Sequence, residues 1–84
     1  MPLFFVPKAF DNIPDDEIDR LERKINWLWV NRKLVTHMAL HGDMKGFFKR
    51  PMGKYRIIYE YNETQDEMIV HLVGNRDSIY KRKT

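Results

Sequence analysis

The chain has 84 residues, no cysteine and a formal net charge of +3, a size that suits one domain with one modest core. The lack of cysteine excludes disulfides, a thiolate nucleophile and a cysteine zinc site. No apolar stretch approaches the roughly 20 residues of a membrane span, and the opening MPLFFVP lacks the features of a signal peptide. We therefore expect a single cytoplasmic domain over residues 1–84, with no removed leader and no membrane partner.

Charge is unevenly placed along the chain, and its placement decides which partners are attracted. Residues 1–40 are neutral overall, whereas residues 41–84 hold nine Lys or Arg against six Asp or Glu. The segment from Lys45 to Arg56 contains five basic residues and no acidic one. Such a run is typical either of solvated surface or of a site for a polyanion, and charge alone leaves both interpretations open.

The first half of the sequence predicts a short strand followed by a helix. The apolar run at 3–6 lies between Pro2 and Pro7, which suits a short strand. Acidic residues then crowd a helix first turn, and apolar residues recur at helical spacing, which predicts a helix over residues 14–31. The apolar residues of its main face are Ile18, Leu21, Ile25, Leu28 and Trp29.

A second side of this helix is also apolar. Trp27, Val30 and Leu34 add surface that one small sheet does not need to cover, and a partner protein is one candidate cover. Residues 31–46 are expected to continue as a shorter helical piece that ends at Gly42, because glycine is typical of helix C-terminal caps.

The second half of the sequence predicts a three-stranded antiparallel meander. Residues 47–61 indicate two strands around a tight turn, with Pro51 at its first central position and Gly53 closing it. A third strand over 67–74 follows the polar loop at 62–66. The predicted class is therefore α+β, with the N-terminal strand and the meander forming a small antiparallel sheet that packs on one or two helices.

Alternation along the middle strand assigns its side chains to two faces of the sheet. The apolar set that should meet the helix is Tyr55, Ile57, Tyr59 and Tyr61. Arg56 is then on the opposite face, and the same parity puts Lys49 on a face with Phe47. A lysine and an arginine would thus lie on facing strands, within reach of one phosphate.

Two other kinds of site are considered. His37 and His41 have the i, i+4 spacing of zinc ligands on a helix, but a zinc peptidase needs a glutamate where this chain has Met38. We therefore expect ordinary surface or capping histidines and no metal. The acidic residues at 15–17 are explained by the helix dipole, and no glycine-rich phosphate loop or serine placed for a triad is present.

An ordered set of short motifs resembles the RelE/ParE toxin superfamily. It consists of L-x-G ending at Gly42, a short basic strand, G-x-Y-R-I-I-Y from Gly53, a hydrophobic strand ending in G-x-R at Arg76, and I-Y ending at Tyr80. The similarity covers nearly the whole chain and is closer from residue 40 to 81. It implies a compact sheet with helices on one face and an active or binding concavity on the other.

The resemblance also implies roles for four residues. Arg56, Arg76 and Tyr80 match superfamily site positions, and Lys49 matches one of two strand lysines. The other lysine position holds Phe47, which puts a full complement of basic groups in doubt. The additional basic residues that are expected to contact RNA are Lys45, Arg50, Lys54, Lys81 and Arg82.

The chemistry that this site would need is limited. RNA supplies its own nucleophile, the 2′-hydroxyl, so a protein must align it, remove its proton and stabilise the charged phosphorane. Arg56 and Arg76 would hold phosphate oxygens, while Lys49 or Tyr80 would act as base. Neither a histidine nor a carboxylate is required. The alternative is that these residues are solvated charges, with Tyr80 closing the core.

RelE-like members of the superfamily cut messenger RNA in the ribosomal A site, and ParE-like members poison DNA gyrase without being nucleases. Arg76 and Tyr80 favour a ribosome-dependent endoribonuclease toxin over a gyrase inhibitor. The expected partners are the ribosome, mRNA and a cognate antitoxin bound at Trp27, Val30 and Leu34, with no small-molecule cofactor.

Overall fold

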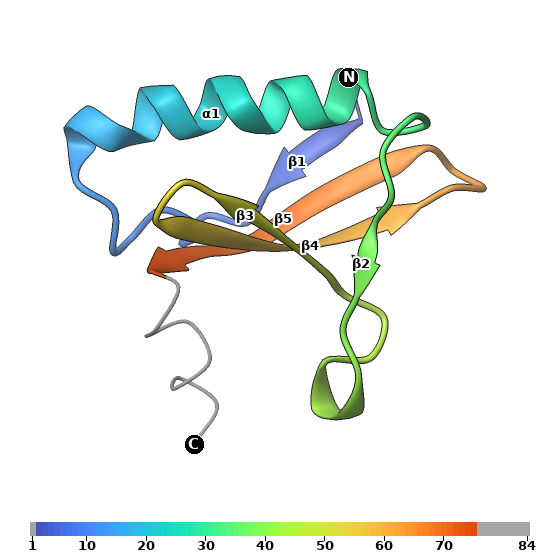
Figure 1. Ribbon diagram of the computed structural model, residues 1–84. Helices are drawn as coiled ribbons and strands as arrows, with labels where there is room; N and C mark the ends of the chain where they lie inside the picture. The colour runs from blue at the N-terminus through green and yellow to red at the C-terminus, as the bar shows by residue number, and fades with distance from the viewer. Residues whose placement is uncertain (1, 76–84) are drawn as a thin grey trace.

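A computed structural model of the protein describes residues 2–75. One helix crosses one face of a five-stranded sheet, and the strand order is β1-β5-β4-β3-β2 (Figure 1). The elements in chain order are β1 (Leu3–Phe5), α1 (Asp15–Val30), β2 (Met38–Ala39), the short 3₁₀ helix η1 (Gly42–Met44), β3 (Phe48–Met52), β4 (Tyr55–Asn62) and β5 (Glu67–Asn75). The predicted α+β class is confirmed.

Helix α1 agrees closely with the sequence prediction. Its first turn contains three acidic residues, which favour the positive end of the helix dipole. Its buried residues are Leu21, Ile25, Leu28 and Trp29. The helix stops at Asn31, whose backbone N–H donates to the Trp27 carbonyl at 3.0 Å and whose side-chain amide donates to the same oxygen at 2.8 Å. A side chain that bonds the last turn in this way favours the end of a helix.

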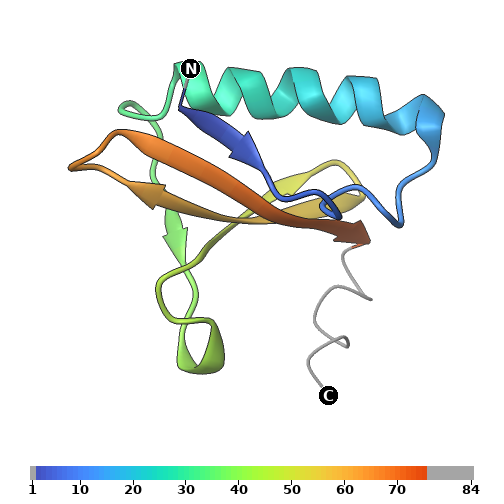
Figure 2. The same ribbon diagram turned by 180° about the vertical axis from the view of Figure 1, so that it is seen from behind.

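The sheet is mixed. Strands β3, β4 and β5 form the predicted antiparallel meander. Strand β1 joins β5 in parallel, with Leu3 opposite Met68 and Phe5 opposite Val70. Figure 2 shows β1 beside β5 under the helix. The N-terminal strand is thus an edge strand of the sheet that α1 covers.

The β3–β4 turn differs from the prediction. Pro51 lies inside β3, opposite Arg56, and the two strands are joined by the two-residue loop Gly53–Lys54. Gly53 has a φ of +64°, a conformation that two-residue hairpin loops require and that glycine adopts at little cost.

The prediction of a second helical piece over residues 31–46 is wrong. Met38 and Ala39 form β2, which pairs antiparallel with Lys49 and Phe48 at the free edge of β3. The unpaired backbone of that edge offers hydrogen bonds that outweigh a weak local helical preference. Gly42 does have a positive φ of +66°, but it begins η1 and does not end an α-helix.

The core lies between α1 and the sheet, and alternation in β4 was assigned correctly. Tyr55, Ile57 and Tyr59 are buried in this core, with Tyr61 packed against it. The other core residues are Ala9, Ile13, Leu21, Ile25, Leu28, Trp29, Met52, Met68, Val70 and Val73. No helix in residues 2–75 is long and apolar enough to cross a membrane.

Candidate functional site

The sheet face opposite α1, here called the outer face, presents one lysine and one arginine on neighbouring strands. Lys49 of β3 is opposite Ile58, and Arg56 of β4 is opposite Pro51. Directly opposite residues of an antiparallel pair point to the same side of the sheet. Because Arg56 and Ile58 are two residues apart on β4, all four side chains share the outer face. Lys49 and Arg56 are both partly buried, which limits the water around their charges.

The other predicted RNA-contacting residues are not all on this face. Arg50 is opposite Ile57 and therefore points to the helix side, where its guanidinium carbon lies 5.7 Å from the centre of the Trp27 ring. Lys54, in the β3–β4 loop, has its Nζ 5.4 Å from the ring centre of Tyr55. Lys45 is exposed directly after η1, and that segment projects to the side away from α1 in Figures 1 and 2.

Three further side chains meet on the outer face, and the sequence pattern does not predict this group. His71 of β5 pairs with Glu60 of β4, with 2.6 Å between Nε2 and Oε1. The Phe47 ring packs against the imidazole with 5.0 Å between ring centres and an interplanar angle of 86°. Phe47 is the residue at the second superfamily lysine position, so this position contributes an aromatic ring.

A change of register in β5 explains why His71 was missed. Ile58 is opposite Leu72, but Tyr59 is opposite Val70, so His71 is an extra residue in β5. Such a β-bulge re-aims side chains. Here it keeps Val70 and Val73 in the same core although they are three residues apart. Simple alternation along β5 cannot reproduce this arrangement.

The far end of β4 and β5 is acidic. Glu60, Glu63 and Glu67 contribute to the wall of a hollow of about 530 Å³ at the β4–β5 turn, together with Gly46 and Ile69. On the outer face, Arg56 lies near the β3–β4 loop and Lys49 near the start of β3, whereas carboxylates gather at the β4–β5 turn. A polyanion would be oriented by this difference.

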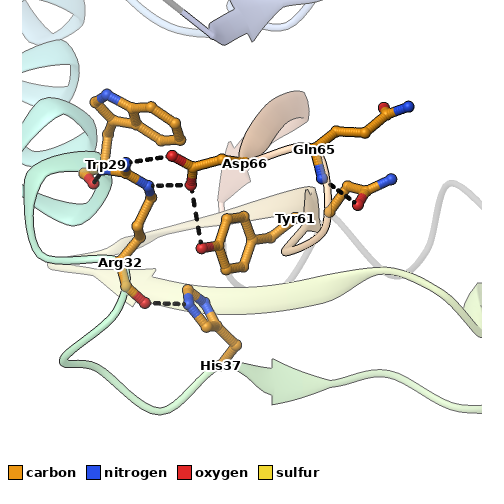
Figure 3. A network of polar contacts seen from close by, with 7 residues as sticks. Trp29, Arg32, His37, Tyr61, Gln65 and Asp66 are labelled. Carbon is orange, nitrogen blue, oxygen red and sulfur yellow. Dashed lines mark hydrogen bonds and ion pairs between the residues drawn. The ribbon is translucent and has the colours of Figure 1, made fainter.

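A polar network ties the end of α1 to the β4–β5 turn (Figure 3). Arg32 donates two hydrogen bonds to Asp66, from Nε to Oδ1 at 2.6 Å and from Nη2 to Oδ2 at 2.7 Å. It also donates from Nη1 to the Trp29 carbonyl at 2.8 Å. The bonds from Arg32 lower the pKa of Asp66, and those to Asp66 raise the pKa of Arg32. The network links the end of α1 to the β4–β5 turn through paired groups.

His37 belongs to the same structural region. Its Nε2 is 2.8 Å from the Arg32 carbonyl and its Nδ1 is 2.6 Å from the Tyr59 hydroxyl. Burial raises the pKa of Tyr59 to about 12, so its hydroxyl keeps its proton at neutral pH. His41 is exposed and lies outside any α-helix, so His37 and His41 do not share a helical face. Within residues 2–75, no three His, Asp or Glu side chains are grouped as metal ligands.

The predicted antitoxin surface is solvent-exposed. Trp27, Val30 and Leu34, here called the helix flank, are 53%, 72% and 84% exposed. Beside Trp27 lies a hollow of about 220 Å³ that is also lined by Lys24 and Arg50. The flank is therefore apolar with two cations at its border.

Four predicted site residues, Arg76, Tyr80, Lys81 and Arg82, lie outside the described residues. Their roles stay predictions from the sequence. Lys49 and Arg56 are the two proposed catalytic residues within the described part of the chain, and they lie on one face of neighbouring strands.

In comparisons of sequence, no family model and no curated protein matches the chain. Comparison of structures finds toxins and toxin–antitoxin complexes. The chain matches the RelBE2 complex of Mycobacterium tuberculosis with a TM-score of 0.75 and 17% identity, over 88% of this chain and 95% of that chain. It matches the RelB–RelE complex of Methanococcus jannaschii with a TM-score of 0.65 and 20% identity, over 96% and 99%.

The isolated RelE toxin of E. coli is similar with a TM-score of 0.64 and 19% identity, over 96% of this chain and 92% of that chain. At this identity the likeness shows the fold. The chain has the RelE-like toxin fold, as the sequence motifs predicted.

Proposed function

We propose that the protein is the toxin of a type II toxin–antitoxin module, and that it inhibits translation by cutting mRNA in the ribosomal A site. The observation that carries this proposal is the placement of Lys49 and Arg56 on one face of the sheet, opposite the helix. Two cations on one face of neighbouring strands can contact the phosphates of one RNA backbone. The RelE-like fold of the chain supports the same reading.

The reaction is attack of a 2′-hydroxyl on the adjacent phosphorus. Lys49 and Arg56 would neutralise the phosphate oxygens, whose charge grows as the phosphorane forms. Arg76 and Tyr80 are proposed to complete the site from the C-terminal segment. The ribosome would hold the mRNA and so supply the alignment that one small domain does not provide by itself.

The helix flank is proposed to bind the antitoxin. Trp27 has the size and exposure of an interface anchor, and aromatic residues dominate the binding energy of many interfaces. Lys24 and Arg50 at its border favour a partner whose helix carries acidic residues beside its apolar ones. The antitoxin would thus combine apolar and charged contacts.

Expression of the protein in growing bacteria tests the proposal. We expect growth to stop and incorporation of labelled amino acids to fall before incorporation of labelled thymidine, with the antitoxin restoring both. The reverse order, together with stalled gyrase cleavage complexes, would identify a ParE-like gyrase inhibitor and contradict the nuclease assignment.

A further inference from the structure

We infer that His71, held by Glu60 and Phe47, is the group that removes the proton from the attacking 2′-hydroxyl. This inference rests on the proposed nuclease function. It concerns a histidine of the outer face to which no role has been given above.

The first observation is the β-bulge. His71 is the extra residue of β5 between Val70 and Leu72, and its contacts with Glu60 and Phe47 place its ring on the outer face. A regular strand would alternate its side chains, and one of the two neighbouring residues would turn to the core. Bulges are common beside active sites because they aim a side chain that a regular strand cannot.

The second observation is that two contacts fix the ring. A carboxylate only accepts hydrogen bonds, so the 2.6 Å contact with Glu60 requires that Nε2 of His71 carries a hydrogen. Nδ1 is then the nitrogen that accepts a proton in the neutral ring. The Phe47 ring restricts rotation of the imidazole from its side. A carboxylate that sets the tautomer and stabilises the protonated ring is how many catalytic histidines are oriented.

The third observation is that the groups that hold His71 are near Lys49. Phe47 is two residues before Lys49 in the chain, and Glu60 is two residues after Ile58, the cross-strand partner of Lys49. Lys49 and Glu60 are therefore diagonal neighbours on one face of the sheet, about 7 to 8 Å apart. The side chain of His71 is 33% exposed, so a substrate held by Lys49 can reach it.

The proposed step is balanced. Nδ1 of His71 takes the proton of the 2′-hydroxyl while the 2′-oxygen forms a bond to phosphorus. The bond from phosphorus to the 5′-oxygen breaks, and that oxygen leaves with the electron pair and takes a proton from water. The products are a 2′,3′-cyclic phosphate and a 5′-hydroxyl. The imidazolium, stabilised by Glu60, then returns its proton to solvent.

Chemical rescue tests this role. His71→Ala is expected to lower the single-turnover rate on programmed ribosomes by about 10²-fold, as loss of a general base commonly does, with ribosome binding unchanged. Imidazole in the buffer should enter the space beside Phe47 and restore much of the rate. Glu60→Gln should lower the rate less, because a glutamine oxygen still accepts from Nε2.

The matched control is His41→Gln, which changes an exposed histidine that is not one of the side chains described around His71 and should cut as the wild type does. Folded His71→Ala that cuts at the wild-type rate, or that is slow and unresponsive to imidazole, would overturn the inference while the wild type remains a nuclease. A wild-type protein that cuts no mRNA on ribosomes would overturn the proposed function and this inference together.

Discussion

Lys49 and Arg50 are neighbours in the sequence, but their side chains lie on opposite faces of the sheet. Lys49 is opposite Ile58 on the outer face, and Arg50 is opposite Ile57 on the face that packs against α1. The basic run from residue 45 to 56 is therefore not one surface. Its cations are divided between a proposed RNA site and the border of the helix flank.

This division predicts different effects for two adjacent substitutions. Lys49→Ala should lower the cleavage rate by about 10²-fold, because it removes a charge that stabilises the phosphorane. Arg50→Ala should leave the rate near that of the wild type and should weaken antitoxin binding. Rates on programmed ribosomes and antitoxin titrations of both variants check this. Equal losses of rate would mean that RNA contacts both faces.

Arg56 is expected to be as important as Lys49. Arg56→Ala should reduce cleavage by about 10²-fold or more without a comparable effect on stability, and we expect the same of Arg76→Ala. Arg56→Lys keeps the charge but loses the planar pair of donors, so its rate should be intermediate. A folded Arg56→Ala variant with normal turnover would show that this arginine has no part in the reaction.

The helix flank should bind antitoxin independently of cleavage. Trp27→Ser is expected to weaken antitoxin binding by about 2 kcal/mol, the loss typical of a buried aromatic anchor, and to leave ribosomal cleavage intact. Phe4→Ser is the control, because Phe4 is a similarly exposed aromatic residue, 49% against 53%, on strand β1. If both variants bind antitoxin as the wild type does, the interface lies elsewhere.

The bonds between Arg32 and Asp66 predict a pH dependence of stability. The pKa of Asp66 is lowered in the folded state. Its contribution to stability is therefore fully present above its pKa in the unfolded chain, about 3.9, and is lost as the pH falls through its pKa in the folded protein. Asp66→Asn should destabilise the protein at pH 7. It should also weaken the dependence of the free energy of unfolding on pH in the acidic range. Asparagine is chosen because it tolerates the φ of 55° at this position.

Urea unfolding at pH 7 and at pH 3 measures this effect. The control is Asp19→Asn, which removes the partner of Arg23 from a pair that is 71% and 77% exposed. Exposed pairs contribute little, so this variant should follow the wild type at both pH values. An Asp66→Asn protein with the same pH dependence as the wild type would contradict the linkage.

Several elements could be predicted from local patterns alone. The spacing of Leu21, Ile25 and Leu28 defined α1, and the alternation in β4 correctly placed Arg56 opposite the helix. These predictions succeed because each depends on the period of one regular element. The same alternation places the Arg50 side chain on the helix side of β3. Its position within a run of basic residues nevertheless suggested a contact with RNA.

The parts that were missed depend on contacts distant in the sequence. Residues 38–39 form a strand because the edge of β3 is available to pair with them. The bulge at His71 depends on how β5 pairs with β4. The His71 side chain then contacts Glu60 of β4. The position of the β3–β4 turn depends on the register between these two strands. The register in which Pro51 is opposite Arg56 puts the turn at Gly53–Lys54.

Mapping the cut ends of mRNA on purified ribosomes tests the proposed ribosome-dependent cleavage. The protein would be added to ribosomes with a defined codon in the A site, and in parallel to the same mRNA without ribosomes. We expect cleavage within the A-site codon only in the presence of ribosomes, a 2′,3′-cyclic phosphate at the new end, and loss of cleavage with Arg56→Ala. Intact mRNA in both reactions would contradict it.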